Sequence, residues 1–148
     1  GKGWYESHGF SRDDKKIYFS GNLLDWWSNN IYCCGLNGAD LTPLTHDDNI
    51  WNEMAELSPD NRWIAFISSR PFKWKKRLGF LTLKTEVFLM DTTGQNIQQI
   101  TYLNDDKHSY LIGDLAWSPD GKTILAVAYE RKSKKMVTLK IEFEEEKR

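Results

Sequence analysis

The sequence predicts an all-β protein built from about three repeated, four-stranded antiparallel meanders, because two sequence patterns recur along it. The first pattern is a turn followed by a β-type run. Ser58-Pro59-Asp60-Asn61 and Ser118-Pro119-Asp120-Gly121 are clear copies, and Ser11-Arg12-Asp13-Asp14 is a degraded one. Ser favours the first position of a type I turn, and Pro presets the backbone of the second. A strand-turn-strand unit that recurs at this spacing predicts a repeat protein.

The fourth position of each turn supports the same prediction. Asp14, Asn61 and Gly121 occupy it, and these are among the residue types that best tolerate a left-handed backbone. The degraded copy therefore keeps the backbone requirement although it has lost its proline.

The second pattern predicts the other two strands of each unit. Residues 30–45 align without a gap with residues 86–101, and each stretch reads as a strand, a Gly-containing turn and a short strand. One unit is therefore a four-stranded meander. We expect a single domain over residues 1–148, with units at about 4–46, 51–102 and 112–143.

The third unit is predicted to be incomplete. Its last strand, over residues 136–143, alternates apolar and polar residues and is followed by a run of charged residues. Two interpretations are open. This strand is an edge whose charges discourage further pairing, or the N-terminal segment around Trp4 and Tyr5 supplies the missing fourth strand and closes the domain.

Composition excludes several classes of function. The chain has 148 residues, a formal net charge of −1 and seven Trp, so no long-range field favours nucleic acid. No apolar run approaches the roughly 18 residues of a membrane span. Cys33 and Cys34 are neighbours on a strand and point to opposite faces, which predicts free thiols. No nucleophile elbow, phosphate-binding loop or Cys–His pair is present, and we expect no cofactor and no metal.

Two segments resemble the TolB-like β-propeller repeat of bacterial proteins. One runs from Leu57 to Phe66 and is followed later in the sequence by the matching residues 86–91. The other runs from Trp117 to Ala126. The resemblance covers the chain from about Glu6 to Phe143 and implies that the meanders are propeller blades. It also implies a periplasmic or extracellular location, with a cytoplasmic one left open. The same repeat occurs in binding proteins, in domains that gate peptidases and in polysaccharide lyases, so it predicts the fold more specifically than the function.

Three blades are fewer than the four to eight of a closed propeller. Three explanations are open. The chain is a fragment of a longer propeller, or two chains form a homodimer that completes a six-bladed ring, or the three units form a compact β-domain.

The first candidate site follows from the resemblance, because the first strand of each blade lines the central channel of such propellers. Polar residues just before the three turns are therefore candidates. They are Glu6, His8, Glu53, Glu56 and Asp114. They predict an acidic channel face able to hold a cation, a metal or a basic peptide group. The alternative is that they are solvated residues at strand ends.

The second candidate site consists of tryptophans in the loops between the second and third strands of the units. Trp26 and Trp27 belong to the first unit and Trp74 to the second. Exposed indoles stack on sugar rings or grip a peptide, and the alternative is that they pack against the neighbouring unit. Basic clusters at residues 73–77 and 131–135 lie in equivalent loops, and the low net charge favours solvation over nucleic-acid binding.

These observations favour a non-catalytic binding or scaffold module that takes a protein segment or a glycan at the channel face. An alternative is a polysaccharide lyase or hydrolase that uses His8 with Glu6, Glu53 or Glu56. A third is a purely structural interaction protein. His46 and His108 lie in loops without the spacing of a metal site.

Overall fold

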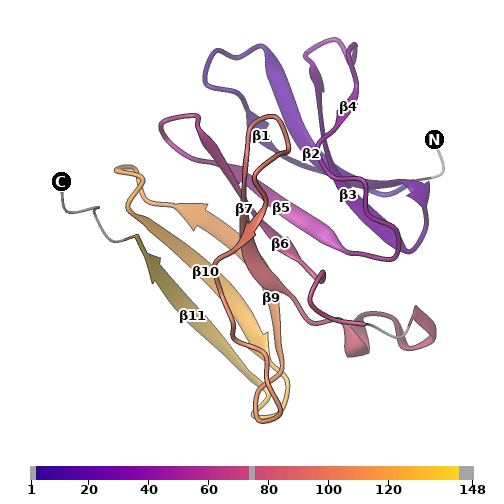
Figure 1. Cartoon of the computed structure of the whole chain (residues 1–148), viewed down its shortest axis with the longest axis vertical. Coiled ribbons are helices and arrows are strands. Elements are labelled where there is room, and N and C mark those ends of the chain that lie inside the picture. Colours follow the sequence, from indigo (N-terminus) through magenta and orange to yellow (C-terminus); the bar gives the residue numbers. More distant parts are fainter. Residues whose placement is uncertain (1–2, 74–75, 144–148) are drawn as a thin grey trace.

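The computed structural model describes residues 3–73 and 76–143, without the side chains of Leu24, Lys76 and Arg77. Its strands form three antiparallel sheets that lie side by side as successive blades (Figure 1), which confirms the predicted all-β propeller-type architecture. Blade 1 contains β1 (Tyr5–Phe10), β2 (Lys16–Asp25), β3 (Ser28–Gly35) and β4 (Thr42–Pro43). Blade 2 contains β5 (Asn52–Leu57), β6 (Trp63–Ser68), β7 (Glu86–Asp91) and β8 (Gln98–Gln99). Blade 3 contains β9 (Tyr110–Trp117), β10 (Thr123–Glu130) and β11 (Lys135–Glu142).

The three repeated turns have the same hydrogen bonds. In each copy the serine hydroxyl donates to the carboxylate two residues later at 2.6 Å. The serine Oγ also accepts the N–H five residues later at 2.9 Å. The backbone φ is 55° at Asp14, 62° at Asn61 and 70° at Gly121. The predicted left-handed position is therefore confirmed in all three copies, including the one without proline.

The second repeated pattern also corresponds to repeated hydrogen bonds. The hydroxyls of Thr45 and Thr101 accept an N–H of the third strand of their blades, at 2.9 and 2.8 Å. Thr45 donates in turn to Asn30 at 2.8 Å, and Thr101 donates to the carboxylate of Glu86 at 2.6 Å. Each threonine thus fastens the end of its blade to the third strand, which explains why the two stretches align without a gap.

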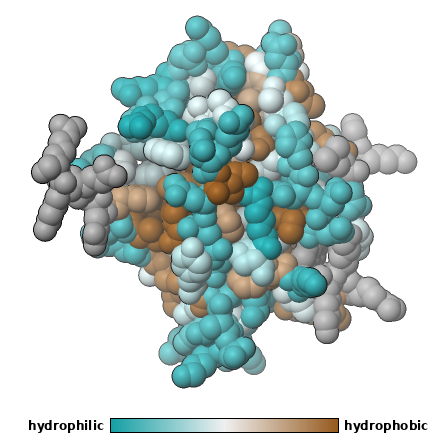
Figure 2. Space-filling view, viewed as in Figure 1, coloured by the Kyte–Doolittle hydropathy of each residue, from teal (hydrophilic) through white to brown (hydrophobic). Residues whose placement is uncertain are grey.

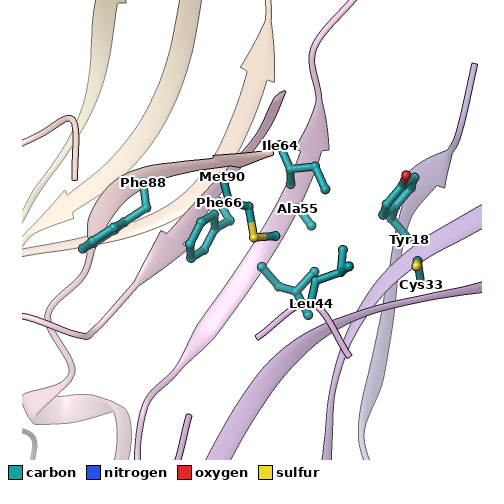
Figure 3. Packing of buried hydrophobic residues seen from close by; sticks show 9 residues of the cluster. Tyr18, Cys33, Leu44, Ala55, Ile64, Phe66, Phe88 and Met90 are labelled. Carbon is teal, nitrogen blue, oxygen red and sulfur yellow. The ribbon is translucent and has the colours of Figure 1, made fainter. Parts of the chain in front are cut away.

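Blade 2 is buried on both faces because it lies between the other two. Ile64 and Phe66 of β6 belong to a cluster with residues of blade 1, and Ala65 and Ile67 belong to a cluster with residues of blade 3. Figure 3 shows Tyr18, Cys33 and Leu44 on the blade 1 side of the first cluster, opposite the side chains of blade 2. A strand that is covered on both faces requires a continuous apolar run, which is what residues 64–67 provide.

A polar seam accompanies this apolar packing between blades 1 and 2. The side-chain amide of Asn52 donates to Asp47 at 3.0 Å, and its carbonyl oxygen accepts from Ser68 at 2.7 Å. Arg70 forms an ion pair with Asp47 at 2.5 Å and lies 5.6 Å from the ring centre of Phe66. Because these polar groups are paired, the seam fixes the orientation of the two blades without the cost of unsatisfied burial.

Blade 3 has three strands in the part of the chain that the structure describes. Within residues 3–73 and 76–143, β11 pairs only with β10. The interpretation in which Trp4 and Tyr5 complete the last blade is wrong, because Tyr5 pairs with Gly21 in blade 1. A local hairpin partner requires a much smaller loop closure than a strand at the other end of the chain. In the described part of the chain, β11 is thus the outer strand of its sheet.

Both outer blades expose apolar side chains. Leu125 is 49% exposed and Met136 is 64% exposed in blade 3, and Tyr5 is 49% exposed in blade 1. Figure 2 shows hydrophobic side chains at the surface across the middle of one face, between hydrophilic ends. Across the part of the chain that the structure describes, no helix is long and apolar enough to cross a membrane.

Candidate functional site

The first strands of the three blades, β1, β5 and β9, lie next to one another. Each pairs irregularly with the second strand of its blade: register shifts occur at Ser7/Gly9, at Glu53/Glu56 and opposite Val127/Ala128. Met54, in the β5 irregularity, has a φ of 57°. A bulge changes the face to which the following side chains point, so these strands present residues that simple alternation would not bring together.

Glu6 and Glu53 form a close carboxyl pair at the junction of β1 and β5. Burial raises the pKa of Glu53 to about 7, the hydrogen bond from Trp51 lowers it, and the neighbouring Glu6 raises it further. The indole nitrogen of Trp51 donates to Oε2 of Glu53 at 3.1 Å. Two carboxyl groups that share a site cannot both ionise easily, so this pair readily retains a proton near neutral pH.

The other channel candidates do not join this pair. Burial, followed by the charge of Asp114, raises the pKa of Glu56, so these two residues approach each other between blades 2 and 3. Asp114 is exposed. His8 is hydrogen-bonded to Ser20 at 2.8 Å, and burial lowers its pKa to about 4. His8 is therefore neutral at physiological pH.

A pocket of about 360 Å³ lies beside the carboxyl pair. Its wall combines residues from blade 1, from the start of blade 2 and from η1 (Lys76–Thr82). This element in the loop between β6 and β7 consists of two short 3₁₀ pieces joined by a kink at Gly79. The lining residues are Trp4, Asn22, Trp26, Trp27, Trp51, Glu53, Gly79 and Phe80.

The aromatic rings of the pocket contact one another in a chain. The ring centres of Trp4 and Trp51 are 5.9 Å apart, and Phe80 meets Trp51 edge to face at 4.9 Å. Trp26 remains 62% exposed at the surface. This arrangement offers aromatic faces beside one carboxyl group, which suits apolar, sugar or cationic ligands.

A residue of blade 3 holds one wall of the pocket. The guanidinium of Arg131 donates to the backbone carbonyl of Phe80 at 2.5 Å and to that of Leu83 at 2.9 Å. The expectation that residues 131–135 are a solvated basic cluster is therefore incomplete, because Arg131 has a structural role across the blade boundary.

The structure thus brings together three residues from the two candidate sites that the sequence predicts separately. Glu53 of the channel set lines the same pocket as Trp26 and Trp27 of the loop set, and Glu6 adjoins it. Trp74 lies outside the described residues. In the described part of the chain, no group of three or more His, Cys, Asp and Glu side chains has a metal-binding arrangement.

Sequence reasoning missed Trp4, Asn22, Trp51 and Phe80. A signal for two of them is present, because Trp4 and Trp51 each lie seven residues before the serine of their turn. Their backbone oxygens also accept equivalent hydrogen bonds, from Asn22 at 3.2 Å and from Ser69 at 3.0 Å. Alignment of the repeats on their serines therefore places Trp4 and Trp51 at equivalent positions. Phe80 lies in an insertion of the second unit that has no equivalent in the first.

The sequence matches no protein-family model and no curated protein. The solved structures that resemble the fold include the following two. TolB from Acinetobacter baumannii has a TM-score of 0.58 and 21% identity, over 88% of this chain and 31% of that one. An oligogalacturonate lyase in complex with manganese has a TM-score of 0.57 and 15% identity, over 93% of this chain and 39% of that one. The chain spans about a third of the length of these structures. At this identity the likeness establishes the fold: three blades of a β-propeller.

Proposed function

We propose that this domain is a non-catalytic binding module that takes a segment of a partner protein in the aromatic pocket. One observation carries the proposal: the structure joins exposed Trp26 and half-buried Trp27 to Glu53 in a single pocket. Trp residues that stay accessible beside a desolvated polar group are typical anchors of protein recognition.

The size of the pocket limits what enters it. Its volume of about 360 Å³ is near the lower end of ligand pockets. It accommodates one side chain or one sugar unit, so the rest of a protein segment would lie across the neighbouring surface. We therefore expect an affinity set mainly by one anchoring side chain.

The experiment is a selection of short random peptides on the immobilised domain, followed by titration of the selected peptides in solution. Binding is measured by tryptophan fluorescence with wild type, with Trp26→Ala and with Tyr102→Ala. Tyr102 is an aromatic control outside the pocket that is 79% exposed. Trp26→Ala should weaken binding about tenfold or more, and Tyr102→Ala should not. Equal binding by all three proteins, or selection of no peptide, contradicts the proposal.

A glycan ligand is the competing binding hypothesis. Oligosaccharides titrated against the same proteins distinguish it, because stacking on Trp26 would quench the same fluorescence. Saturable binding of an oligosaccharide, lost in Trp26→Ala, would replace the protein segment with a glycan as the ligand.

An enzymatic function is a second candidate because one property of Glu53 favours it. A carboxyl with a pKa of about 7 is suited to act as a general acid. The test is degradation of oligogalacturonate in the presence of Mn²⁺, compared between wild type, Glu53→Gln and His8→Ala. We expect no degradation by any of them. Turnover that either substitution abolishes would establish the lyase alternative.

We also propose that the outer blades pack against further blades, supplied by a second copy of the chain in a six-bladed ring or by additional sequence. The exposed Leu125, Met136 and Tyr5 support this proposal, because a propeller blade normally covers such residues. Light scattering tests it: a dimer supports the ring, and reversible association at high concentration supports missing blades. A stable monomer with little binding of a hydrophobic dye would contradict both.

A periplasmic or extracellular location belongs to the same proposal and rests on the TolB-like resemblance. Cell fractionation with an antibody against the domain tests it, and recovery in the cytoplasmic fraction would contradict it.

A further inference from the structure

The Glu53 carboxyl has no cationic partner among the residues that the structure describes. Among the described residues, neither Glu53 nor Glu6 takes part in an ion pair. Oε2 of Glu6 is buried and has no hydrogen-bond partner. A desolvated carboxylate without a counter-charge is costly, and an occupant of the pocket with a positive charge would remove this cost.

Two cations that flank η1, in space or in sequence, have other partners. Arg131 donates to the carbonyls of Phe80 and Leu83. The ammonium of Lys84 lies 5.8 Å from the ring centre of Phe72. The printed contacts of both cations are therefore with groups other than Glu53.

The other walls of the pocket also suit a cation. Trp4, Trp26, Trp27, Trp51 and Phe80 surround the space beside Glu53. The faces of indole and phenyl rings carry partial negative charge and attract ammonium groups, most strongly where water is excluded. An aromatic enclosure with one acidic group is thus complementary to a compact positive charge on an apolar stem.

We propose that the pocket binds an alkylammonium group, namely the side-chain ammonium of a lysine in the partner segment. This inference rests on the proposed binding function and names the chemistry of its anchoring residue. The ammonium lies against the Glu53 carboxylate, and the methylene stem of the lysine lies between the indole rings.

A sugar fits this pocket less well. A sugar ring presents several hydroxyl groups that require both donors and acceptors. Among the described lining side chains, only those of Asn22 and Glu53 offer a carbonyl or carboxyl group. Oδ1 of Asn22 already accepts the N–H of Trp4 at 2.5 Å. A lysine side chain needs one negatively charged hydrogen-bond acceptor and apolar walls around its methylene stem, and the pocket provides both.

Binding of the ammonium is linked to a proton. Glu6 on β1 is the charged neighbour that acts on Glu53, whereas Asp114 on β9 acts on Glu56 and His8 on β1 is neutral above about pH 4. Because Glu53 has a pKa of about 7, the ammonium displaces a proton below that pH. Affinity therefore rises with pH through about 7 and then levels off.

The experiment titrates the full domain with Nα-acetyl-lysine methylamide and with its Nε-acetylated derivative, which keeps the stem but has no charge. Chemical shifts of the indole N–H groups report binding to wild type, Glu53→Gln, Trp26→Leu and Glu142→Gln. Glu142 is a matched control, since its exposed carboxylate pairs with Lys140. We expect the charged probe to bind about tenfold tighter than the neutral one. Glu53→Gln should abolish this preference and its pH dependence, Trp26→Leu should reduce it, and Glu142→Gln should preserve it.

Equal affinities for the two probes would overturn the lysine assignment, as would a preference that survives Glu53→Gln. Selected peptides that depend on Trp26 but contain no lysine would also overturn it and leave the binding function intact. If no peptide, neither probe and no oligosaccharide shifts the indole signals, both the binding function and the lysine assignment fail.

Discussion

The indole nitrogen of Trp51 donates a hydrogen bond of 3.1 Å to the carboxyl of Glu53, two residues later in the chain. Trp51 thereby links the aromatic wall of the pocket to its acidic group. The bond favours the ionised carboxylate, whereas burial and Glu6 favour the protonated form. The balance between these opposing effects determines the charge of the pocket near neutral pH.

The first prediction concerns the titration of Glu53. Trp51→Phe removes a hydrogen bond to the carboxylate, so the pKa of Glu53 should rise above about 7. Glu6→Gln removes a neighbouring negative charge, so this pKa should fall. Carbon NMR of the side-chain carboxyls across a pH series measures both. If the pKa of Glu53 shifted in the same direction in both variants, the opposing effects of Trp51 and Glu6 on Glu53 would be contradicted.

The same group predicts how stability depends on pH. The folded protein binds the Glu53 proton more tightly than the unfolded chain does, since its pKa rises from 4.5 to about 7. This stabilisation is complete below about pH 4.5 and is lost as the pH rises through 7. At most about 3–4 kcal/mol is involved, at about 1.4 kcal/mol per pKa unit. Urea denaturation of wild type and Glu53→Gln at several pH values tests it: the variant should lack this pH-dependent component.

The third prediction concerns the repeated turn. Ser58 is 5% exposed, and its Oγ accepts the N–H of Trp63 at 2.9 Å. Ser58→Ala leaves this N–H and the Asp60 carboxylate without the hydroxyl, which should reduce the free energy of unfolding by about 1–3 kcal/mol. Ser7→Ala, at an exposed position of β1, should have little effect in the same urea denaturation. Equal effects of the two substitutions would show that the turn hydroxyl is dispensable.

The fourth prediction concerns the fastening of the blade end. Thr101 accepts the N–H of Val87 at 2.8 Å and donates to Glu86, whose side chain is almost fully buried. Thr101→Val keeps the shape but removes both hydrogen bonds, so it should destabilise the domain by about 1–3 kcal/mol. Thr101→Ser keeps the hydroxyl and should retain most of the stability. A serine variant as unstable as the valine variant would assign the effect to packing.

The fifth prediction links blade 3 to the pocket. Arg131→Ala removes the donors to the carbonyls of Phe80 and Leu83, so η1 should open more often. Hydrogen exchange should increase in η1, and the affinity of the pocket for its ligand should fall, because Phe80 forms part of its wall. Lys135→Ala, at an exposed position of β11, is the control and should change neither. Unchanged exchange in the Arg131 variant would contradict this link.

Much of the fold was predictable because it depends on local backbone chemistry. The turns require a serine, a carboxylate and a residue that tolerates positive φ, and Ser11, Asp13 and Asp14 keep all three without proline. The threonine that fastens each blade end was also visible in the alignment of residues 30–45 with 86–101. The strand that Tyr5 joins was not predictable from the sequence, because both the first blade and the incomplete third blade offered it a partner strand. In the structure Tyr5 pairs with Gly21 of the first blade.

The pocket was only partly predictable for a different reason. Trp26 and Glu53 were separate candidates because they lie on different blades, and the sequence contains no measure of the distance between them. The packing of β5 against β1 places Glu53 beside Glu6, and Arg131 in another blade holds the backbone of Phe80. The sequence by itself therefore determined the repeating unit, because its turns and strands depend on interactions between residues that are close in the chain. Packing between blades created the site, because burial and the pKa of Glu53 are properties of groups that meet only after folding.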